Sequence, residues 1–220
     1  MRGLLRLTCP ILFSFSLQHA VASCAMVSDS AVVAATLRWL DGWVIKRQLC
    51  PFAAAARSHT KTVVCRGGAK EASAAVAAEV ALLRDATMDE PATTLLVLPK
   101  LIDSFEDLMY LQEAESQKLE ADDTSQPIIQ LLAFHPLAEF GELPDDAADL
   151  SMRSPYPILH LLRDSDVSAA EEQWEQQHAP GVAPSIQERN AALLRGMGYE
   201  VAAAEARASW NDGDLNDSGA

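Results

Sequence analysis

Residues 93–99, TTLLVLP, form the stretch that decides the fold. Two threonines lead into a continuous apolar run, which is typical of a strand covered on both faces of a sheet. Two further β-rich runs, KTVVCR (61–66) and PIIQLLAF (127–134), flank it along the chain. Each run is bounded by glycine, proline or polar residues, so the sequence predicts three short strands.

Helical patterns separate these strands. Apolar side chains recur at steps of three and four residues over 30–49 and 70–86, and a serine can cap a helix over 105–120. The capping box SIQE (185–188) opens another helix. This alternation predicts an α/β fold: a single layered domain with a central sheet of three to four short strands, some of them parallel, and helices packed on it.

The two ends of the chain differ from the middle. Residues 1–28 contain Arg2, Arg6, a short apolar centre and small residues, but no acid, which is the composition of a targeting peptide. The predicted organisation is a targeting peptide (1–28), one α/β domain (29–206) and a disordered acidic tail (207–220). We therefore expect targeting to an organelle or to the secretory route, with an unprocessed N-terminal tail and a cytoplasmic protein as the alternative.

The balance of acidic and basic residues limits which kinds of partner the protein is expected to bind. The chain has 17 basic and 31 acidic residues and a net charge of −14. Nucleic-acid binding needs clustered Lys and Arg, so no nucleic-acid partner is predicted. The apolar run near the N-terminus is shorter than the roughly 20 residues of a membrane span, so we expect a soluble domain without an integral membrane segment.

The stretch RSPYPILHLLRD (153–164) concentrates unusual residues. It lacks the alternation of polar and apolar residues that a half-exposed strand shows. A helix fits the pattern better, with Ser154 as N-cap and Pro155 as the first helical residue. The polar face of this helix would carry Tyr156, His160, Arg163 and Asp164.

A second polar group is expected beside this helix. His135 follows the run 127–134, at the carboxyl end of what we expect to be a central strand, and open α/β sheets bind ligands at such ends. Residues 135–152 show neither a helical nor a strand-like spacing of apolar residues, and a long irregular stretch in a compact domain is often functional. This stretch contains Asp145 and Asp146, and Arg153 follows it directly.

Three segments carry a family resemblance. They are WVIKRQLCPFA (43–53), AFHPLAEFGELPDDAADLSMRSPYPILHLLRD (133–164) and IQERNAALLR (186–195). Together they resemble an uncharacterised family of bacterial and plant proteins catalogued as domain of unknown function 1415. The resemblance covers about residues 30–200 and implies a shared fold and site, but no reaction, since the family has no established activity.

The catalytic candidates are His135, His160 and Cys50. Two imidazoles can supply an acid and a base near neutral pH, and a cysteine near a histidine can act as a nucleophile. The alternatives are histidines that only hydrogen-bond the long loop, and a cysteine buried as a small hydrophobic residue. Cys50 and Cys65 lack zinc-site spacing but can form one disulfide in an oxidising compartment. The histidines match no metal motif with the neighbouring aspartates, so no metal is predicted.

The candidates for ligand binding carry charges or hydroxyls. Guanidinium groups bind carboxylates and phosphates bidentately, and ion pairs with nearby aspartates are the alternative. These candidates are Arg153, Tyr156, Arg163, Asp145, Asp146 and Arg189.

The sequence contains no Walker loop, GxGxxG, GxSxG or HExxH motif, so no cofactor is assigned. We predict a small enzyme or binding protein for an anionic metabolite, with a site lined by His and Arg. The alternative is a non-catalytic module in which the same His, Arg and Asp residues only pin the long loop. Whether the protein is an enzyme stays open.

Overall fold

The computed structural model describes residues 27–87, 92–100, 103–122, 128–140, 143–177 and 184–211. Four strands in these residues form one sheet in the order β1-β2-β4-β3. They are β1 (Thr60–Val64), β2 (Thr93–Val97), β3 (Ile129–Phe134) and β4 (Ile158–Arg163). β1 and β2 are parallel, and β4 runs antiparallel to both of its neighbours. The predicted α/β fold, with a sheet of three to four short strands and some parallel pairing, is confirmed.

The helix predicted over 153–164 is wrong, because residues 158–163 form the strand β4. β4 lies between β2 and β3, and both faces of the sheet are covered. Ile158 therefore packs in one core cluster and Leu159 in the other, and no alternation of polar and apolar residues is required. Ser154 caps no helix; its hydroxyl donates to the carbonyl of Tyr156 at 2.6 Å.

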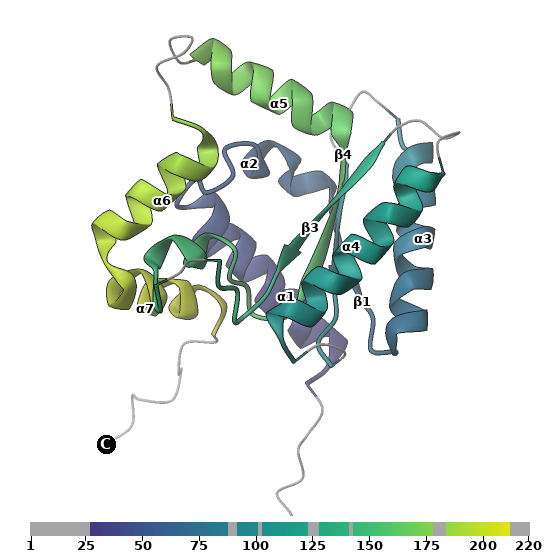
Figure 1. Ribbon diagram of the computed structural model, residues 1–220, viewed down its shortest axis with the longest axis horizontal. Coiled ribbons are helices and arrows are strands. Elements are labelled where there is room, and N and C mark those ends of the chain that lie inside the picture. Colours follow the sequence, from purple (N-terminus) through teal and green to yellow (C-terminus); the bar gives the residue numbers. More distant parts are fainter. Residues whose placement is uncertain are drawn as a thin grey trace, which may run out of the picture.

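One face of the sheet is covered by the helices at the two ends of the described chain (Figure 1). This layer comprises α1 (Asp29–Trp39), the π-helical segment η1 (Leu40–Ile45), the 3₁₀ helix η3 (Ala147–Ser151), α6 (Ile186–Met197) and α7 (Tyr199–Trp210). The helix predicted over 30–49 corresponds to α1 and η1. The chain then turns at Gln48, which has a left-handed φ of 54°, before Pro51.

Two long helices cover the opposite face: α3 (Ala69–Asp85) and α4 (Phe105–Ala121). The hydroxyl of Ser104 accepts a hydrogen bond from the Asp107 N–H at 3.1 Å, so the predicted cap of α4 is confirmed. The capping box of Ser185 and Glu188 at the start of α6 is confirmed as well.

The short elements α2 (Ala53–Ala56) and η2 (Arg57–His59) connect the first layer to β1, and α5 (Asp164–Gln177) starts where β4 ends. Arg163, the last residue of β4, is fully buried at this junction. Its guanidinium donates to Asp166 in the first turn of α5 at 2.8 Å and to the carbonyl of Thr87 at 2.8 Å. An ion pair between the buried Arg163 and the partly exposed Asp166 therefore fixes the direction in which α5 leaves the sheet.

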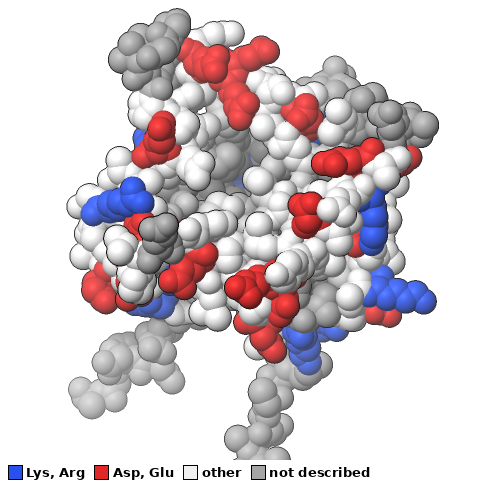
Figure 2. Space-filling view, in the orientation of Figure 1, with Lys and Arg blue, Asp and Glu red and all other residues white. Residues whose placement is uncertain are grey.

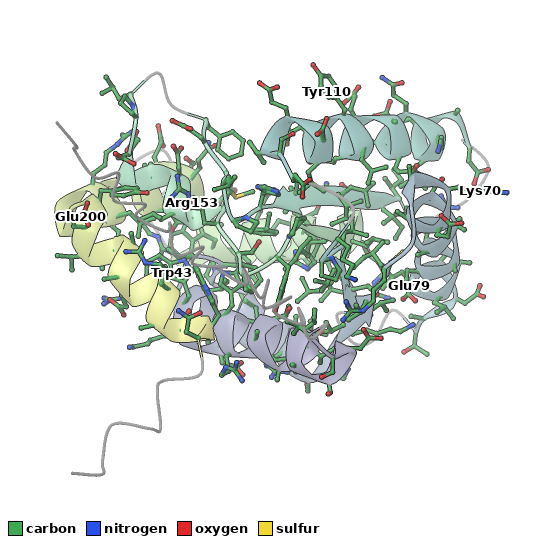
Figure 3. The ribbon with its side chains drawn as sticks, turned by 90° about the horizontal axis from the view of Figure 1, so that it is seen from below. Trp43, Lys70, Glu79, Tyr110, Arg153 and Glu200 are labelled. Carbon is green, nitrogen blue, oxygen red and sulfur yellow. The ribbon has the colours of Figure 1, made fainter. Side chains whose placement is uncertain are left out.

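The layer of α1 and α7 encloses polar side chains as well as apolar ones. Figure 3 shows Trp43 and Arg153 inside this layer, whereas Tyr110 and Lys70 point away from the protein. The indole N–H of Trp43 donates to the carbonyl of Leu150 at 3.1 Å, and that of Trp39 donates to the carbonyl of Arg153 at 2.9 Å. These bonds satisfy buried backbone groups of the chain between β3 and β4.

The ends of the predicted domain fall partly outside the described residues. Of the predicted targeting segment 1–28, residues 1–26 lie outside them, as do residues 212–220 of the predicted tail. Helix α7 continues to Trp210, four residues into the segment assigned to the tail, and the carbonyl of Trp210 accepts a hydrogen bond from Arg38 at 3.0 Å. Within the described part of the chain, no helix combines the length and the apolar character that crossing a membrane requires.

Candidate functional site

A groove of about 930 Å³ lies between the edge strand β3, the end of η1, η3 and the helices α5 and α6. Figure 2 shows a hollow in the surface below α5, with acidic side chains gathered at this helix. The volume is within the usual range of about 300–1,000 Å³ for small-molecule sites. The lining residues are Val44, Leu49, Cys50, Pro51, Leu132, Phe134, Phe140, Asp146, Ala148, Asp149, Ser151, Met152, Glu171, Trp174, Glu175, Ser185, Ile186, Gln187, Asn190, Ala191 and Arg195.

Most of this lining comes from the three segments 43–53, 133–164 and 186–195, which are far apart in the sequence; Leu132, Glu171, Trp174, Glu175 and Ser185 are the exceptions. Hydrogen bonds connect the three segments to one another. Trp43 of the first segment donates to the carbonyl of Leu150 in the second at 3.1 Å. The groove is therefore formed by the same segments through which the sequence resembles a known family.

Helix α6 positions the chain around Cys50. The buried Asn190 donates to the carbonyl of Leu49 at 2.7 Å, and the guanidinium of Arg189 donates to the carbonyl of Gln48. Arg189 also lies over the indole ring of Trp174, with 5.3 Å between the guanidinium carbon and the ring centroid. Two backbone carbonyls before Cys50 are thereby held by side chains of α6.

Asp146 connects the loop after β3 to α6. Its carboxylate accepts two hydrogen bonds from Arg195, at 3.0 and 2.6 Å, and one from the Ala148 N–H at 3.0 Å, which caps η3. The hydrogen bond from Arg195 is the main reason why the pKa of Asp146 falls to about 2, with the backbone N–H adding to it. Asp146 therefore stays ionised down to a low pH and pairs with Arg195, not with Arg153.

Asp149 is the buried acid of the groove wall, with 4% of its surface exposed. One carboxylate oxygen accepts a hydrogen bond from the Phe140 N–H at 3.1 Å. The other, Oδ2, is covered and has no hydrogen-bond partner among the described residues. A buried carboxylate oxygen without a donor is unfavourable, so Oδ2 of Asp149 is an unsatisfied acceptor in the groove wall.

Cys50 is exposed in the groove wall, so its interpretation as a small buried hydrophobic residue is wrong. The turn at Gln48 and Pro51 carries it out of the core, while its neighbour Leu49 is buried. Cys50 and Cys65 are both free thiols. Burial lowers the pKa of Arg189, and the negative charge of a Cys50 thiolate would act on it in the opposite direction.

His160 lies on β4, and its ring centroid is 6.1 Å from that of Phe134, a residue of the groove wall. The hydroxyl of Thr93 donates to the carbonyl of Leu161 at 2.8 Å and lies 2.6 Å from Nε2 of His160. Because the hydroxyl proton is already used, Nε2 carries the imidazole proton and donates it to Thr93. Burial lowers the pKa of His160 to about 4, so the ring is neutral at pH 7.

The structure does not bring His135 and His160 together. β3 is an edge strand, so His135 follows the edge of the sheet and not a central strand as expected. His135 is 2% exposed and lies against Phe105 of α4, on the side opposite to Phe134 and His160. Its Nδ1 accepts a hydrogen bond from the Leu137 N–H at 3.0 Å, so this ring helps to form the turn after β3.

The guanidinium groups of Arg153 and Arg163 both contact protein oxygens. Arg153 donates to the carbonyl of Ala138 at 3.0 Å and to the hydroxyl of Tyr199 at 2.7 Å. Arg163 is buried at the β4–α5 junction, and neither arginine lines the groove. Of the remaining candidates, Tyr156 packs partly buried against the core, and Asp145 is exposed with a left-handed φ of 58°.

Of the nine candidate site residues, Cys50 and Asp146 line the groove, and His160 and Arg189 lie against residues that do. Reasoning from the sequence missed Asp149 and the α5 residues Glu171, Trp174 and Glu175. Asp149 does lie in the aperiodic stretch 135–152, whose irregularity indicated a functional loop. Within the described residues, no three His, Cys, Asp or Glu side chains form a group that could hold a metal ion.

The fold and the groove define an α/β protein with one domain and an open, largely apolar groove on one side of a mixed sheet. The family model described as Protein of unknown function (DUF1415) matches residues 31–204, so the chain belongs to this family. No curated protein and no solved structure matches the chain.

Proposed function

We propose that the protein binds a small molecule in the groove between β3, η3, α5 and α6. The observation that carries this proposal is the construction of the groove from three distant segments that are hydrogen-bonded to one another around a volume of about 930 Å³. A site whose walls are fixed before the ligand arrives loses little conformational entropy on binding. No reaction is assigned, although the exposed thiol of Cys50 offers a nucleophile in the wall.

The walls suit a ligand with an apolar body. Leu132, Phe134, Phe140 and Met152 supply apolar and aromatic surface. The exposed fractions of Leu132 and Phe140 are 38% and 56%, which is high for side chains of this kind. Covering such a surface is favourable because apolar area leaves water.

Binding of an anionic metabolite, as expected from the sequence, is a second candidate function. The observation that favours it is a smaller pocket of about 340 Å³ beside the groove, lined by Lys46, Arg47, Gln48, Arg189 and Leu193. Lys46 and Arg47 share the single carboxylate of Glu205, so positive charge is in excess there. An NMR titration with inorganic phosphate, repeated on Arg189→Gln, tests this candidate: phosphate shifts at this pocket in the parent protein and weaker binding by the variant support it.

The non-catalytic alternative also has support in the contacts. Arg153, Asp149 and the pair Asp146–Arg195 hold the chain between β3 and β4 in place. Pinning this chain and binding a ligand are compatible, because the pinned residues Asp146 and Asp149 also line the groove.

The test of the groove is to fill it. Ala191 lines the groove, so Ala191→Trp should occupy part of its volume, whereas Ala204→Trp places the same side chain on an exposed position of α7 outside the groove. A library of small heterocyclic metabolites is screened by ligand-observed NMR against the three proteins. We expect compounds that bind the parent protein and Ala204→Trp but bind Ala191→Trp at least tenfold more weakly. Absence of any such compound would contradict the proposal.

A further inference from the structure

The charges of the groove are mostly negative. Its lining contains the acids Asp146, Asp149, Glu171 and Glu175 and one basic residue, Arg195. Helix α5, which forms one side, has two acids in its first turn and no basic residue in its last. Figure 2 shows acidic side chains gathered over this helix, next to the hollow. A ligand entering the groove therefore meets a negative potential.

The single arginine does not neutralise these acids. Arg195 binds Asp146 through two hydrogen bonds and acts on Asp149 only as a more distant charge. In the described part of the chain, Glu171 and Glu175 form no ion pair with a basic side chain. Three of the four acids thus lack a hydrogen-bonded cation.

Asp149 adds a point of attachment to this potential. It is 4% exposed, lies in the groove wall, and its Oδ2 has no donor within the described residues, while its other oxygen is held by the Phe140 N–H. An ammonium group is a strong donor to a carboxylate oxygen. An ammonium group would supply the missing hydrogen bond and a positive charge, which most acids of the groove lack as a partner.

We propose that the ligand of the groove is an organic amine with an apolar or aromatic body. Its ammonium group is attracted by Glu171 and Glu175 and donates to Oδ2 of Asp149, which a rotation of the Asp149 side chain brings to the groove surface. This inference rests on the proposed function and names the chemical class of its ligand. Phe134, Phe140 and Trp174 also line the groove and provide aromatic surface for the body.

Three probes that share an indole body test the class: tryptamine (cationic), tryptophol (neutral) and indole-3-propionate (anionic). Their dissociation constants are measured by protein-observed NMR at pH 7. We expect tryptamine to bind about tenfold or more tighter than tryptophol, as a charge-assisted hydrogen bond predicts, and indole-3-propionate to bind most weakly.

Asp149→Asn is the informative variant, because its amide oxygen can still accept the hydrogen bond from the Phe140 N–H while the negative charge is lost. It should bring tryptamine to within about threefold of tryptophol and leave tryptophol unchanged. Glu200→Gln removes the same charge from an exposed position of α7 outside the groove and should change neither constant.

A second variant covers the case in which Asp149→Asn does not fold. The double change Glu171→Gln and Glu175→Gln affects exposed positions of α5, so the fold should be retained. It should weaken tryptamine binding about two- to fivefold at low salt, and the effect should shrink at 1 M salt, where the Debye length is about 3 Å.

Equal binding of the three probes, tighter binding of the anion, or a preference for tryptamine that survives Asp149→Asn would overturn the amine proposal. If none of the three probes binds, the amine proposal is overturned as well. The proposal of a ligand-binding groove is decided separately, by whether Ala191→Trp blocks any compound of the metabolite library.

Discussion

The neutral, partly buried imidazole of His160 makes the free energy of unfolding depend on pH between about pH 6.5 and 4. The pKa of His160 falls from 6.5 to about 4 because burial disfavours the charged ring. Above pH 6.5 the ring is neutral in both the folded and the unfolded chain, so it adds no pH dependence. Between pH 6.5 and about 4 only the unfolded chain binds the proton, so the free energy of unfolding falls with decreasing pH.

The size of this effect follows from the pKa difference. Each pH unit within the window removes about 1.4 kcal/mol from the free energy of unfolding, so about 3 kcal/mol is lost between pH 6.5 and 4. Below the window both states are protonated and the loss stops. His160→Gln removes the titration, while its amide N–H₂ can still donate to the hydroxyl of Thr93.

The assay is urea unfolding followed by tryptophan fluorescence, at half-unit steps from pH 7.5 to 4, for the parent protein and His160→Gln. Carboxylates such as Asp146 titrate in both proteins, so their contribution cancels in the difference between the two curves. We expect this difference to change by about 3 kcal/mol across the window, with the parent protein losing more stability. A difference that stays constant within about 0.5 kcal/mol would refute a lowered pKa of His160 in the folded protein.

Three further predictions concern residues whose surroundings differ from what the sequence indicated. Cys50 should react with iodoacetamide in the folded protein at a rate within about tenfold of that of a small free thiol. It should also react faster than the partly buried Cys65. Labelling of Cys50 only after unfolding would contradict its exposure. Arg163→Met should cost about 2 kcal/mol and lower the melting temperature by roughly 6 °C, because Asp166 and the carbonyl of Thr87 lose the buried guanidinium that donates to them. A shift below about 2 °C would count against this role. Arg153→Met and Tyr199→Phe, combined in a double-mutant cycle by urea unfolding, should show a coupling energy of about 1 kcal/mol, and additive effects would argue against their hydrogen bond.

The sequence predicted correctly those helices and strands that are determined by residues within or next to the element itself. The apolar run of β2, the cap at Ser104 and the capping box at Ser185 require only neighbouring residues, and the structure confirms all three. The helix predicted over 153–164 failed because the periodicity of a strand depends on what covers it. Nothing in the local sequence shows that residues 158–163 enter the middle of the sheet.

The candidate site was predictable only in part, for the same physical reason. The long stretch after β3 correctly drew attention to Asp146, but its partner Arg195 comes from α6. His135 was expected at the carboxyl end of a central strand, but β3 is an edge strand of the described sheet, so His135 lies at the edge. The partners of the buried Arg163 are the carbonyl of Thr87 and the carboxylate of Asp166 in α5, and the spacing of these residues in the sequence does not reveal that they meet.

The position of β4 also bears on how the chain folds as it leaves the ribosome. β1 and β2 can pair once residue 97 has been made, but among the described strands β3 pairs only with β4, which ends at residue 163. Until then the nascent chain carries an apolar β3 without its partner strand, and its free edges are open to other chains. Because β4, which joins β3 to the β1–β2 pair, is made last, the sheet is completed late through contacts between distant residues. This is expected to make folding slow relative to that of a helical bundle of similar size.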